Sequence, residues 1–233
     1  KKTVLWNHNS VFIADSHARA GILDGNPIHR DMEYAAKQAG LAFILNVVIN
    51  GDKHVIAAFA GDADKAHRKG CEFVASLARV DAVPADIVVT SNGGYPLDQN
   101  IYQTVKGLTA AEACVRQGGV AIICSSCVDG SGGDFFYHLI ADAPSAQAAY
   151  ENLNGISPAD TEFDQWEAQI LARILVKANV IIVSEHCDPK MITDMHMLHA
   201  SDLPQAMRMA EQIAGADSRV TVIPDGIAVI VKA

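Results

Sequence analysis

Basic charge is scarce in this sequence. Its 18 lysines and arginines stand against 27 aspartates and glutamates, which gives a formal net charge of -9 at pH 7. A nucleic-acid surface needs a basic face to neutralise phosphates, so we expect no nucleic-acid partner. No apolar run approaches the roughly 20 residues that span a bilayer, and the stretch from Lys1 to Trp6 lacks the apolar core of a secretion signal. We therefore predict a cytoplasmic protein with no membrane partner.

Cysteine is also sparse, and its distribution argues against a disulfide framework. The five cysteines are odd in number and spread over the chain, at Cys71, Cys114, Cys124, Cys127 and Cys187. This pattern fits reduced thiols in a cytoplasm. Cys124 and Cys127 do match the C-x-x-C spacing, but a zinc site of this kind needs a second such pair, and none occurs. A zinc or redox site at these two residues remains a minor alternative.

The usual nucleotide-binding motifs are missing as well. No G-x-G-x-x-G follows a strand, and the glycine-rich loop at residues 129–133 lacks the Lys-Ser/Thr ending of a P-loop. That loop could still hold an anion through its backbone N–H groups. A nucleotide or other anion would therefore have to be bound by a less common arrangement.

The hydrophobic pattern that is present predicts an α/β fold. Short apolar runs alternate with amphipathic runs from residue 86 onward, which implies right-handed βαβ crossovers and a mainly parallel, Rossmann-like sheet flanked by helices. The expected strands cover residues 86–89, 120–125, 180–184 and 219–223, and the expected helices cover 100–117, 145–153, 163–177 and 203–215. Before them we expect a helix at 27–40, a hairpin at 43–49 and 55–60, and a helix at 62–77.

The turn at residues 90–107 is the strongest candidate for a binding site. It joins a predicted strand to a predicted helix, so it lies at the carboxyl end of the strand, where ligands bind in open α/β sheets. Tyr102, Gln103 and Lys106 then project polar groups from the first turns of the helix, with Tyr102 and Lys106 on one face. The lysine could clamp a carboxylate and the glutamine could bind a hydroxyl or phosphate. A solvated helix surface explains the same residues about equally well.

Two further residues allow a structural and a functional interpretation. His8 lies in an aromatic and polar cluster, and an isolated histidine is usually a hydrogen-bonded surface or core residue; alternatively, its imidazole binds nickel or zinc. Trp166 stands at a helix start, where an indole usually serves packing, although its face could stack on an aromatic cofactor.

Residues 91–106 resemble the nickel-pincer-nucleotide lactate racemase family. The motif Gly94-Tyr95-Pro96-Leu97-Asp98 with its downstream glutamine and lysine carries the resemblance. It continues in the family's order through residues 7–9, 18–27, 58–62 and 164–173, and so covers nearly the whole chain.

The resemblance implies an isomerase with a nickel cofactor. Members of this family are two-lobed enzymes that racemise or epimerise 2-hydroxy acids. Their cofactor is a pyridinium mononucleotide that holds nickel, accepts a hydride from the substrate Cα and returns it to either face. By the same resemblance His8 is the metal ligand, Tyr102, Gln103 and Trp166 bind the cofactor, and Gln103 and Lys106 bind the substrate. Lys106 is then the catalytic residue that stabilises developing charge.

The family pattern also implies that this chain is a carboxyl-terminal portion. The cofactor-attachment lysine, the paired catalytic histidines and a substrate-binding arginine are expected upstream of Lys1. We therefore predict residues 1–80, joined by 210–233, to be a remnant of the amino-terminal, cofactor-bearing lobe, and residues 84–209 to be the carboxyl-terminal α/β lobe. The chain alone should be inactive, with the missing lobe as its partner. Lactate, malate, sugar acids and longer hydroxy acids all remain open as substrates. The alternative is a non-catalytic module of the same fold that binds a small anion or a partner.

Overall fold

A five-stranded parallel sheet forms the centre of the larger half of the molecule. The computed structural model describes residues 2–232, and its main sheet has the strand order β7-β6-β5-β4-β8. The strands are β4 (Ala85–Ser91), β5 (Val115–Cys124), β6 (Asn179–Val183), β7 (Leu198–Ala200) and β8 (Val220–Ile223). Both faces of β4, β5 and β6 are covered, which explains their nearly continuous apolar sequences. The predicted α/β fold with a parallel, helix-flanked sheet is confirmed.

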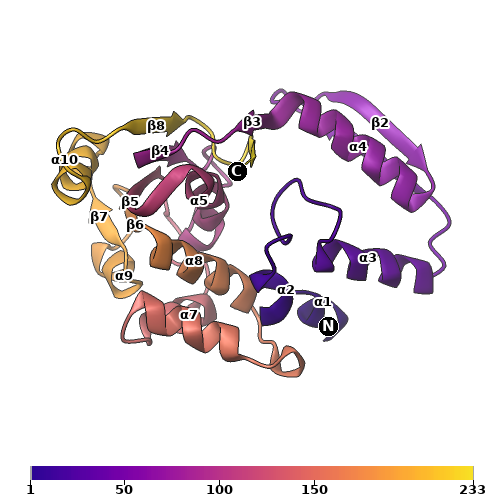
Figure 1. Ribbon diagram of the computed structural model, residues 1–233, viewed down its shortest axis with the longest axis horizontal. Coiled ribbons are helices and arrows are strands. Elements are labelled where there is room, and N and C mark those ends of the chain that lie inside the picture. The colour runs from indigo at the N-terminus through magenta and orange to yellow at the C-terminus, as the bar shows by residue number, and fades with distance from the viewer. Residues whose placement is uncertain (1, 233) are drawn as a thin grey trace.

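Helices cover both faces of this sheet (Figure 1). One face packs against the larger helical layer, and Val88, Ile123 and Ile182 of the strands contribute to that core. The other face is covered by α10 (Leu203–Ala214), whose Ala206 and Ala210 pack with Ile122 and Ile181. The helical layer consists of α5 (Ile101–Cys114), α6 (Asp134–Ala141), α7 (Ala146–Gly155), α8 (Gln165–Lys177) and α9 (Pro189–Asp194). The carboxyl edge of the sheet is thus left for loops and helix starts.

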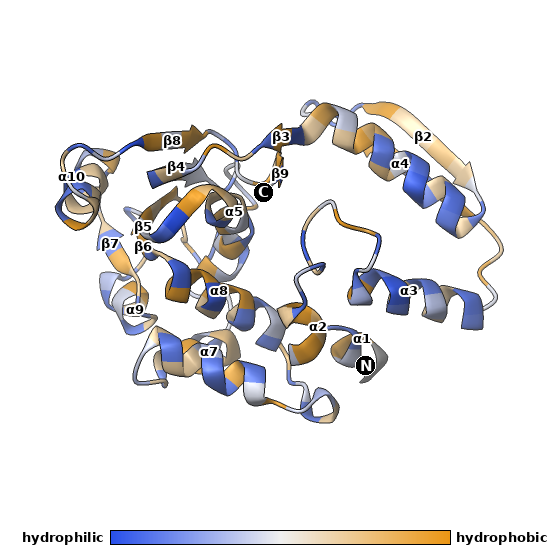
Figure 2. Cartoon of the chain, viewed as in Figure 1, coloured by the Kyte–Doolittle hydropathy of each residue, from blue (hydrophilic) through white to orange (hydrophobic). Residues whose placement is uncertain are grey.

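The smaller half contains a hairpin and two helices. The hairpin pairs β1 (Ile44–Ile49) with β2 (Val55–Gly61) in antiparallel fashion. The helices are α3 (Pro27–Gln38) and α4 (Ala63–Ala78). Figure 2 shows that β2 is largely hydrophobic, yet its Val55 and the Leu45 of β1 are 60% and 64% exposed. A two-stranded sheet with so much apolar surface is poorly covered.

The last strands differ from their expected placement. We expected residues 210–233 to join the amino-terminal lobe, but β8 pairs in parallel with β4, from Ile87 opposite Val220 to Thr90 opposite Ile223. The reason is that β4 would otherwise expose its backbone groups as a sheet edge, and β8 pairs with them. Only β9 (Ile230–Lys232) leaves this sheet, and it pairs with β3 (Arg79–Asp81), where the chain passes between the halves.

The chain begins with two short helices, α1 (Lys2–Asn7) and α2 (Ser10–Ala14), and α2 lies against the larger half. The Ser10 hydroxyl donates a hydrogen bond to the carbonyl of Ile156 at 2.6 Å, and the Gln169 amide donates to the carbonyl of Ser10 at 2.8 Å. Residues 10–14 are therefore attached to α7 and α8, although we assigned residues 1–80 to the amino-terminal lobe.

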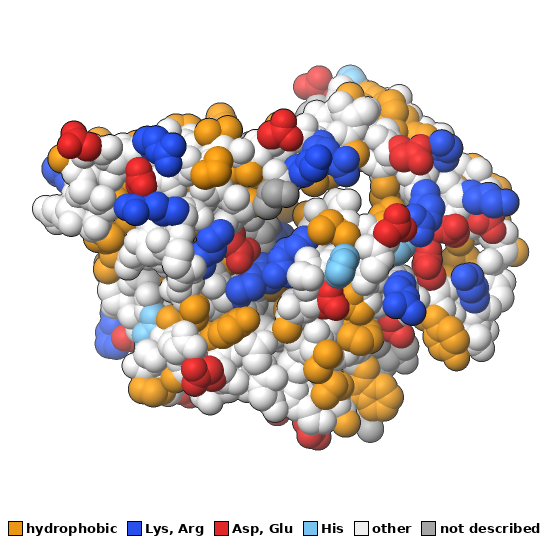
Figure 3. All heavy atoms as spheres, viewed as in Figure 1, with side chains coloured by type: hydrophobic (Ala, Val, Ile, Leu, Met, Phe, Trp, Pro, Cys, Tyr) orange, Lys and Arg blue, Asp and Glu red, His pale blue; other side chains and the backbone are white. Residues whose placement is uncertain are grey.

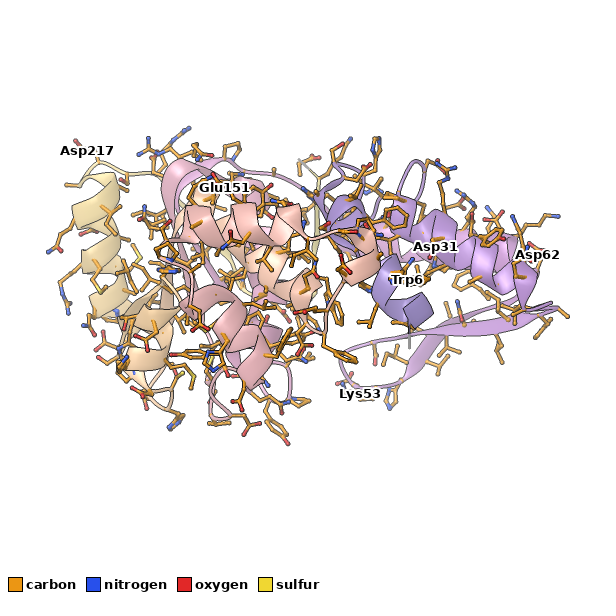
Figure 4. The ribbon with its side chains drawn as sticks, turned by 90° about the horizontal axis from the view of Figure 1, so that it is seen from below. Trp6, Asp31, Lys53, Asp62, Glu151 and Asp217 are labelled. Atoms are coloured by element: carbon orange, nitrogen blue, oxygen red, sulfur yellow. The ribbon has the colours of Figure 1, made fainter. Side chains whose placement is uncertain are left out.

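The same segment also touches the smaller half. The Asn7 amide donates to the carbonyl of Ile28 at 3.1 Å and to the Asp31 carboxylate at 2.9 Å. Figure 4 accordingly shows Trp6 of α1 beside Asp31 of α3. Figure 3 shows Lys and Arg side chains gathered near the middle of the drawn face, where the two halves meet. The pKa of Arg19 lies below its ordinary value. Burial is the main cause, and the positive charge of Arg173 adds to it.

Several element boundaries depart from the predicted ones. The helix expected at 100–117 ends at Cys114, because β5 begins at Val115 and passes through Gly118, whose φ of +74° suits only glycine well. The short elements β3, β7, β9, α6 and α9 were not predicted. Within residues 2–232, no helix is long and apolar enough to cross a membrane.

Candidate functional site

The candidate site starts where β4 ends. Asn100 caps α5, and its side-chain oxygen accepts a hydrogen bond from the backbone N–H of Gln103 at 2.9 Å. Tyr102 and Gln103 therefore occupy the first turn of α5, at the carboxyl edge of the sheet. This is the location at which parallel sheets bind their ligands.

Asn92 holds this helix start in place. Its side chain is fully buried, and its amide donates to the carbonyls of Leu97 and Gln103, the latter at 3.0 Å. Its side-chain oxygen accepts from the backbone N–H of Gly107 at 2.9 Å. Asn92 is thus a buried clamp that fixes the first turns of α5.

The glycine-rich loop at 129–133 has a similar positioning role. The carbonyls of Gly130 and Ser131 accept hydrogen bonds, both of 3.0 Å, from the backbone N–H groups of Ile101 and Tyr102. The loop thus takes up the first free N–H groups of α5. Our interpretation of this loop as an anion cradle built from N–H groups gains no support from these contacts, in which the loop offers carbonyls.

His8 lies against Trp166, and its orientation suits metal binding. The two ring centroids are 4.8 Å apart with an interplanar angle of 51°. The Nδ1 atom of His8 is 2.9 Å from the carbonyl oxygen of Val4, which can only accept. This hydrogen bond therefore places the proton on Nδ1 and leaves the lone pair on Nε2, the arrangement in which histidine binds a metal.

Tyr102 connects this pair to α5. The Tyr102 side chain lies near Trp166, and its ring meets Phe136 edge-on at 5.2 Å. Burial first, and then the carboxylates of Glu167 and Asp164, raise the pKa of Tyr102 to about 12, so the phenol proton stays in place at neutral pH.

Lys106 and Gln103 form the exposed side of the site. The Lys106 ammonium donates to the Gln103 side-chain oxygen at 2.6 Å. Lys106 also interacts electrostatically with Glu167, which is only 6% exposed. The pKa of Glu167 is raised to about 7, chiefly by burial; the charge of Lys106 lowers it and the carboxylate of Asp164 raises it.

The structure thus links all five predicted site residues. His8 touches Trp166, Trp166 lies near Tyr102, and Gln103 and Lys106 follow Tyr102 on the same helix. Sequence reasoning missed Glu167, which faces both Tyr102 and Lys106. The only available signal was its position next to Trp166 in the first turn of a helix.

The donor set can serve one metal ion and an acidic ligand. It supplies an imidazole with a free lone pair, an aromatic wall, a protonated phenol, and an amide beside a cation. These groups fit a nickel-bearing aromatic cofactor together with the carboxylate or hydroxyl of a small acid.

Two other groups of potential metal ligands are less suited to metals. Burial raises the pKa of the Cys124 and Cys127 thiols, which disfavours the thiolates that zinc binds. His196 and His199 each place Nε2 within 3.0 Å of a backbone carbonyl, of Ala143 and Ser184 respectively, so these nitrogens serve structural hydrogen bonds.

Comparison with known proteins identifies the family. The family profile of the lactate racemase C-terminal domain matches residues 80–231. The chain belongs to the lactate racemase family. It is 53% identical over 229 residues to a lactate racemase from Thermoanaerobacterium thermosaccharolyticum and 50% identical over 231 residues to one from Lactiplantibacillus plantarum. These alignments cover 98% and 99% of this chain but 54% of each relative, so the chain spans about half of their length.

Solved structures extend the comparison. The structure of the lactate racemase apoprotein from Thermoanaerobacterium thermosaccharolyticum superposes with a TM-score of 0.97 at 53% identity, and covers 99% of this chain and 55% of that one. A protein from Thermotoga maritima superposes over 89% of this chain and 54% of its own length, with a TM-score of 0.64 at 14% identity. The second match shows a shared fold only. The fold of about half of that lactate racemase chain is thus reproduced over 99% of this chain.

Proposed function

We propose that this chain is the carboxyl-terminal portion of a 2-hydroxy-acid racemase or epimerase that uses a nickel-pincer nucleotide. The observation that carries the proposal is the contact of His8 with Trp166 in one site with Tyr102, Gln103 and Lys106. The family supports racemase chemistry. Since the chain spans about half of its relatives, we assign the activity to a longer protein and expect the 233-residue chain alone to be inactive.

We assign each residue the role that the family resemblance implies. His8 would hold nickel through Nε2, while Trp166 and Tyr102 would flank the nucleotide. When bound, this cofactor supplies a group that accepts a hydride from the substrate Cα and returns it. Gln103 and Lys106 would bind the oxygens of the 2-hydroxy acid. A fixed ammonium close to the hydroxyl carbon stabilises the charge that develops on oxygen, and so lowers the barrier in both directions.

Glu167 and Tyr102 support this arrangement. The charge of Lys106 lowers the pKa of Glu167 and so favours its ionised form. The phenol of Tyr102 remains a donor toward the cofactor or substrate because its pKa is about 12. We place the enzyme in the cytoplasm, since its five cysteines are free thiols in the structure.

The first test measures racemisation. The longer protein, produced together with the enzymes that make the cofactor, should racemise at least one member of a panel containing lactate, malate, sugar acids and longer hydroxy acids. Lys106→Ala should lower kcat/KM by about 10²- to 10³-fold, because a charge that stabilises the transition state is lost. Lys190→Ala is the matched control: this lysine is exposed, pairs with Asp194 on α9, and should leave kcat/KM unchanged.

Metal analysis provides the second arm of this test. His8→Ala should lose nickel while circular dichroism shows an intact fold. Bound nickel without activity on any hydroxy acid would remove the racemase proposal. Absence of nickel from the correctly folded wild-type protein would instead favour a non-catalytic module that binds a small anion or a partner.

A further inference from the structure

A second group of metal-binding side chains lies in the smaller half, between α3 and α4. His29 and Glu33 are one helical turn apart on α3, and Asp64 is in the first turn of α4. Their ligand atoms all lie within 4.8 Å of one another. Figure 4 labels Asp62, the residue that caps α4, and so marks the beginning of the helix that carries Asp64. None of these residues belongs to the site around His8.

His29 indicates that this cluster lacks a ligand. The side chain is 9% exposed, and its Nε2 atom has no hydrogen-bond partner. The nearest acceptor, Oε1 of Glu33, is 3.1 Å away, within ion-pair distance, but it is not aligned for a hydrogen bond. A buried ring nitrogen without a partner is costly, and a metal ion would satisfy it.

The carboxylates supply a second reason for a cation. Glu33 and Asp64 offer carboxylate oxygens within 4.8 Å of one another, and a cation between them offsets their mutual repulsion. Arg68 supplies part of the positive charge near these two carboxylates. Its Nε is 2.7 Å from Oδ1 of Asp64, and another guanidinium nitrogen is 3.9 Å from Glu33. Arg68 thus holds the Asp64 carboxylate from outside the cluster, and such outer hydrogen bonds orient metal ligands.

We propose that His29, Glu33 and Asp64 bind a divalent transition-metal ion, best matched by zinc, which ties α3 to α4. One imidazole and two carboxylates are ordinary zinc ligands, with bonds of about 2.0–2.2 Å that place ligand atoms roughly 3.4 Å apart in a tetrahedron. The His29–Glu33 separation of 3.1 Å is close to this value. The Asp64 carboxylate has to move closer to the other two ligands, by a small side-chain rotation.

The surroundings leave room for this ion and for a fourth ligand. A cavity of about 290 Å³ lies beside the cluster and is lined by His29, Glu33, Asp64 and His67, among others. The His67 ring stacks on His29 with centroids 5.2 Å apart, which limits rotation of the imidazole. Water or an added side chain would complete the coordination.

Zinc titration of the longer protein, free of tags and cofactor, tests this site. All variants carry His8→Ala, so that the site proposed for nickel contributes nothing, and metal binding is read without any activity assay. Calorimetry should give one zinc ion per chain, and cobalt should give the visible absorption of a tetrahedral complex. His29→Ala should weaken zinc binding at least about tenfold, as loss of a ligand does. His54→Ala, at an exposed histidine near the hairpin turn, should leave it unchanged.

Conservative variants guard against misfolding. If His29→Ala does not fold, Glu33→Gln and Asp64→Asn replace it, and each should weaken binding at least about tenfold as well. Zinc should also raise the Tm of the protein with intact ligands and leave the Tm of the ligand variants unchanged. Absence of stoichiometric zinc binding, or equal binding with and without the three ligands, overturns the proposal.

Discussion

Glu167 is the residue whose properties depend most on its surroundings. Its carboxyl is 6% exposed and has a pKa of about 7, mainly because of burial. The ordinary value is 4.5, so the folded state holds the proton more tightly than the unfolded state. The contribution of protonated Glu167 to the free energy of unfolding is therefore fully present below about pH 4.5. It is lost as the pH rises through about 7.

Glu167→Gln should remove this pH dependence. The amide cannot ionise, so the variant should gain up to about 3 kcal/mol in free energy of unfolding relative to wild type between pH 5 and pH 8, from 1.36 kcal/mol per pKa unit. Urea denaturation at the two pH values measures the change. Glu151→Gln, at an exposed carboxyl on α7, is the control and should show the same pH dependence as wild type. Parallel pH curves for wild type and Glu167→Gln would contradict the assignment.

At the level of single residues, the resemblance predicted most of the site. It indicated His8, Trp166, Tyr102, Gln103 and Lys106, which the structure links by contacts. Asn92 and Glu167 could not be assigned their environments, because burial of a polar side chain results from packing between distant segments. The roles of all these residues in catalysis stay predictions.

Among the elements, α5 approaches β4 unusually closely. A Cβ added at Gly107 would lie 2.7 Å from Oδ1 of Asn92 and 2.9 Å from the carbonyl oxygen of Ser91. Gly226 also lies close to Gly107: a Cβ added at Gly226 would lie 2.8 Å from the carbonyl oxygen of Gly107. Backbone atoms cannot move aside easily, so these glycines set the distance at which α5 and its site residues stand from the sheet.

Gly107→Ala should therefore destabilise the protein. Overpacking at this position should lower the free energy of unfolding by about 1–3 kcal/mol. Gly155→Ala is the matched control on α7, where an added Cβ meets nothing within 4 Å, and it should leave stability unchanged or raise it by up to about 1 kcal/mol. Chemical denaturation measures both. Equal stability of the Gly107→Ala variant and wild type would show that the helix can shift at no cost.

Elements with long periodic patterns could be predicted, and short ones could not. The strands near residues 86–89, 120–125 and 180–184 have enough consecutive apolar residues to be recognised. By contrast, β7 and β9 have three residues each, and they are strands only because a neighbouring strand pairs with them. The wrong end of the helix at 100–117 has the same origin, since pairing with β4 draws residues 115–117 into β5.

The whole molecule divides into a well-covered half and a poorly covered one. The five-stranded sheet is enclosed by helices, whereas the β1–β2 hairpin exposes large apolar side chains, including Leu45, Val47 and Ile49. Pairing of β8 with β4 could not be read from the sequence, because it joins segments about 130 residues apart whose local patterns are compatible with either half.

Hydrogen exchange should reveal this difference. In the 233-residue chain, amides of β1 and β2 should exchange at least about a hundredfold faster than those of β5 and β6, because few buried contacts oppose local opening. Mass spectrometry of peptic fragments compares the two regions in one sample. In the longer protein the hairpin should become more protected if further strands or helices cover it. Equal exchange in both regions of the short chain would show that the hairpin is already stable.

The attachment of Ser10 to Ile156 and Gln169 has a mechanical consequence. His8 lies two residues before Ser10, so the larger half holds its imidazole beside the indole of Trp166, with 4.8 Å between the ring centroids. Since Asn7 also bonds to α3, any shift of that helix would pull on the chain next to the imidazole.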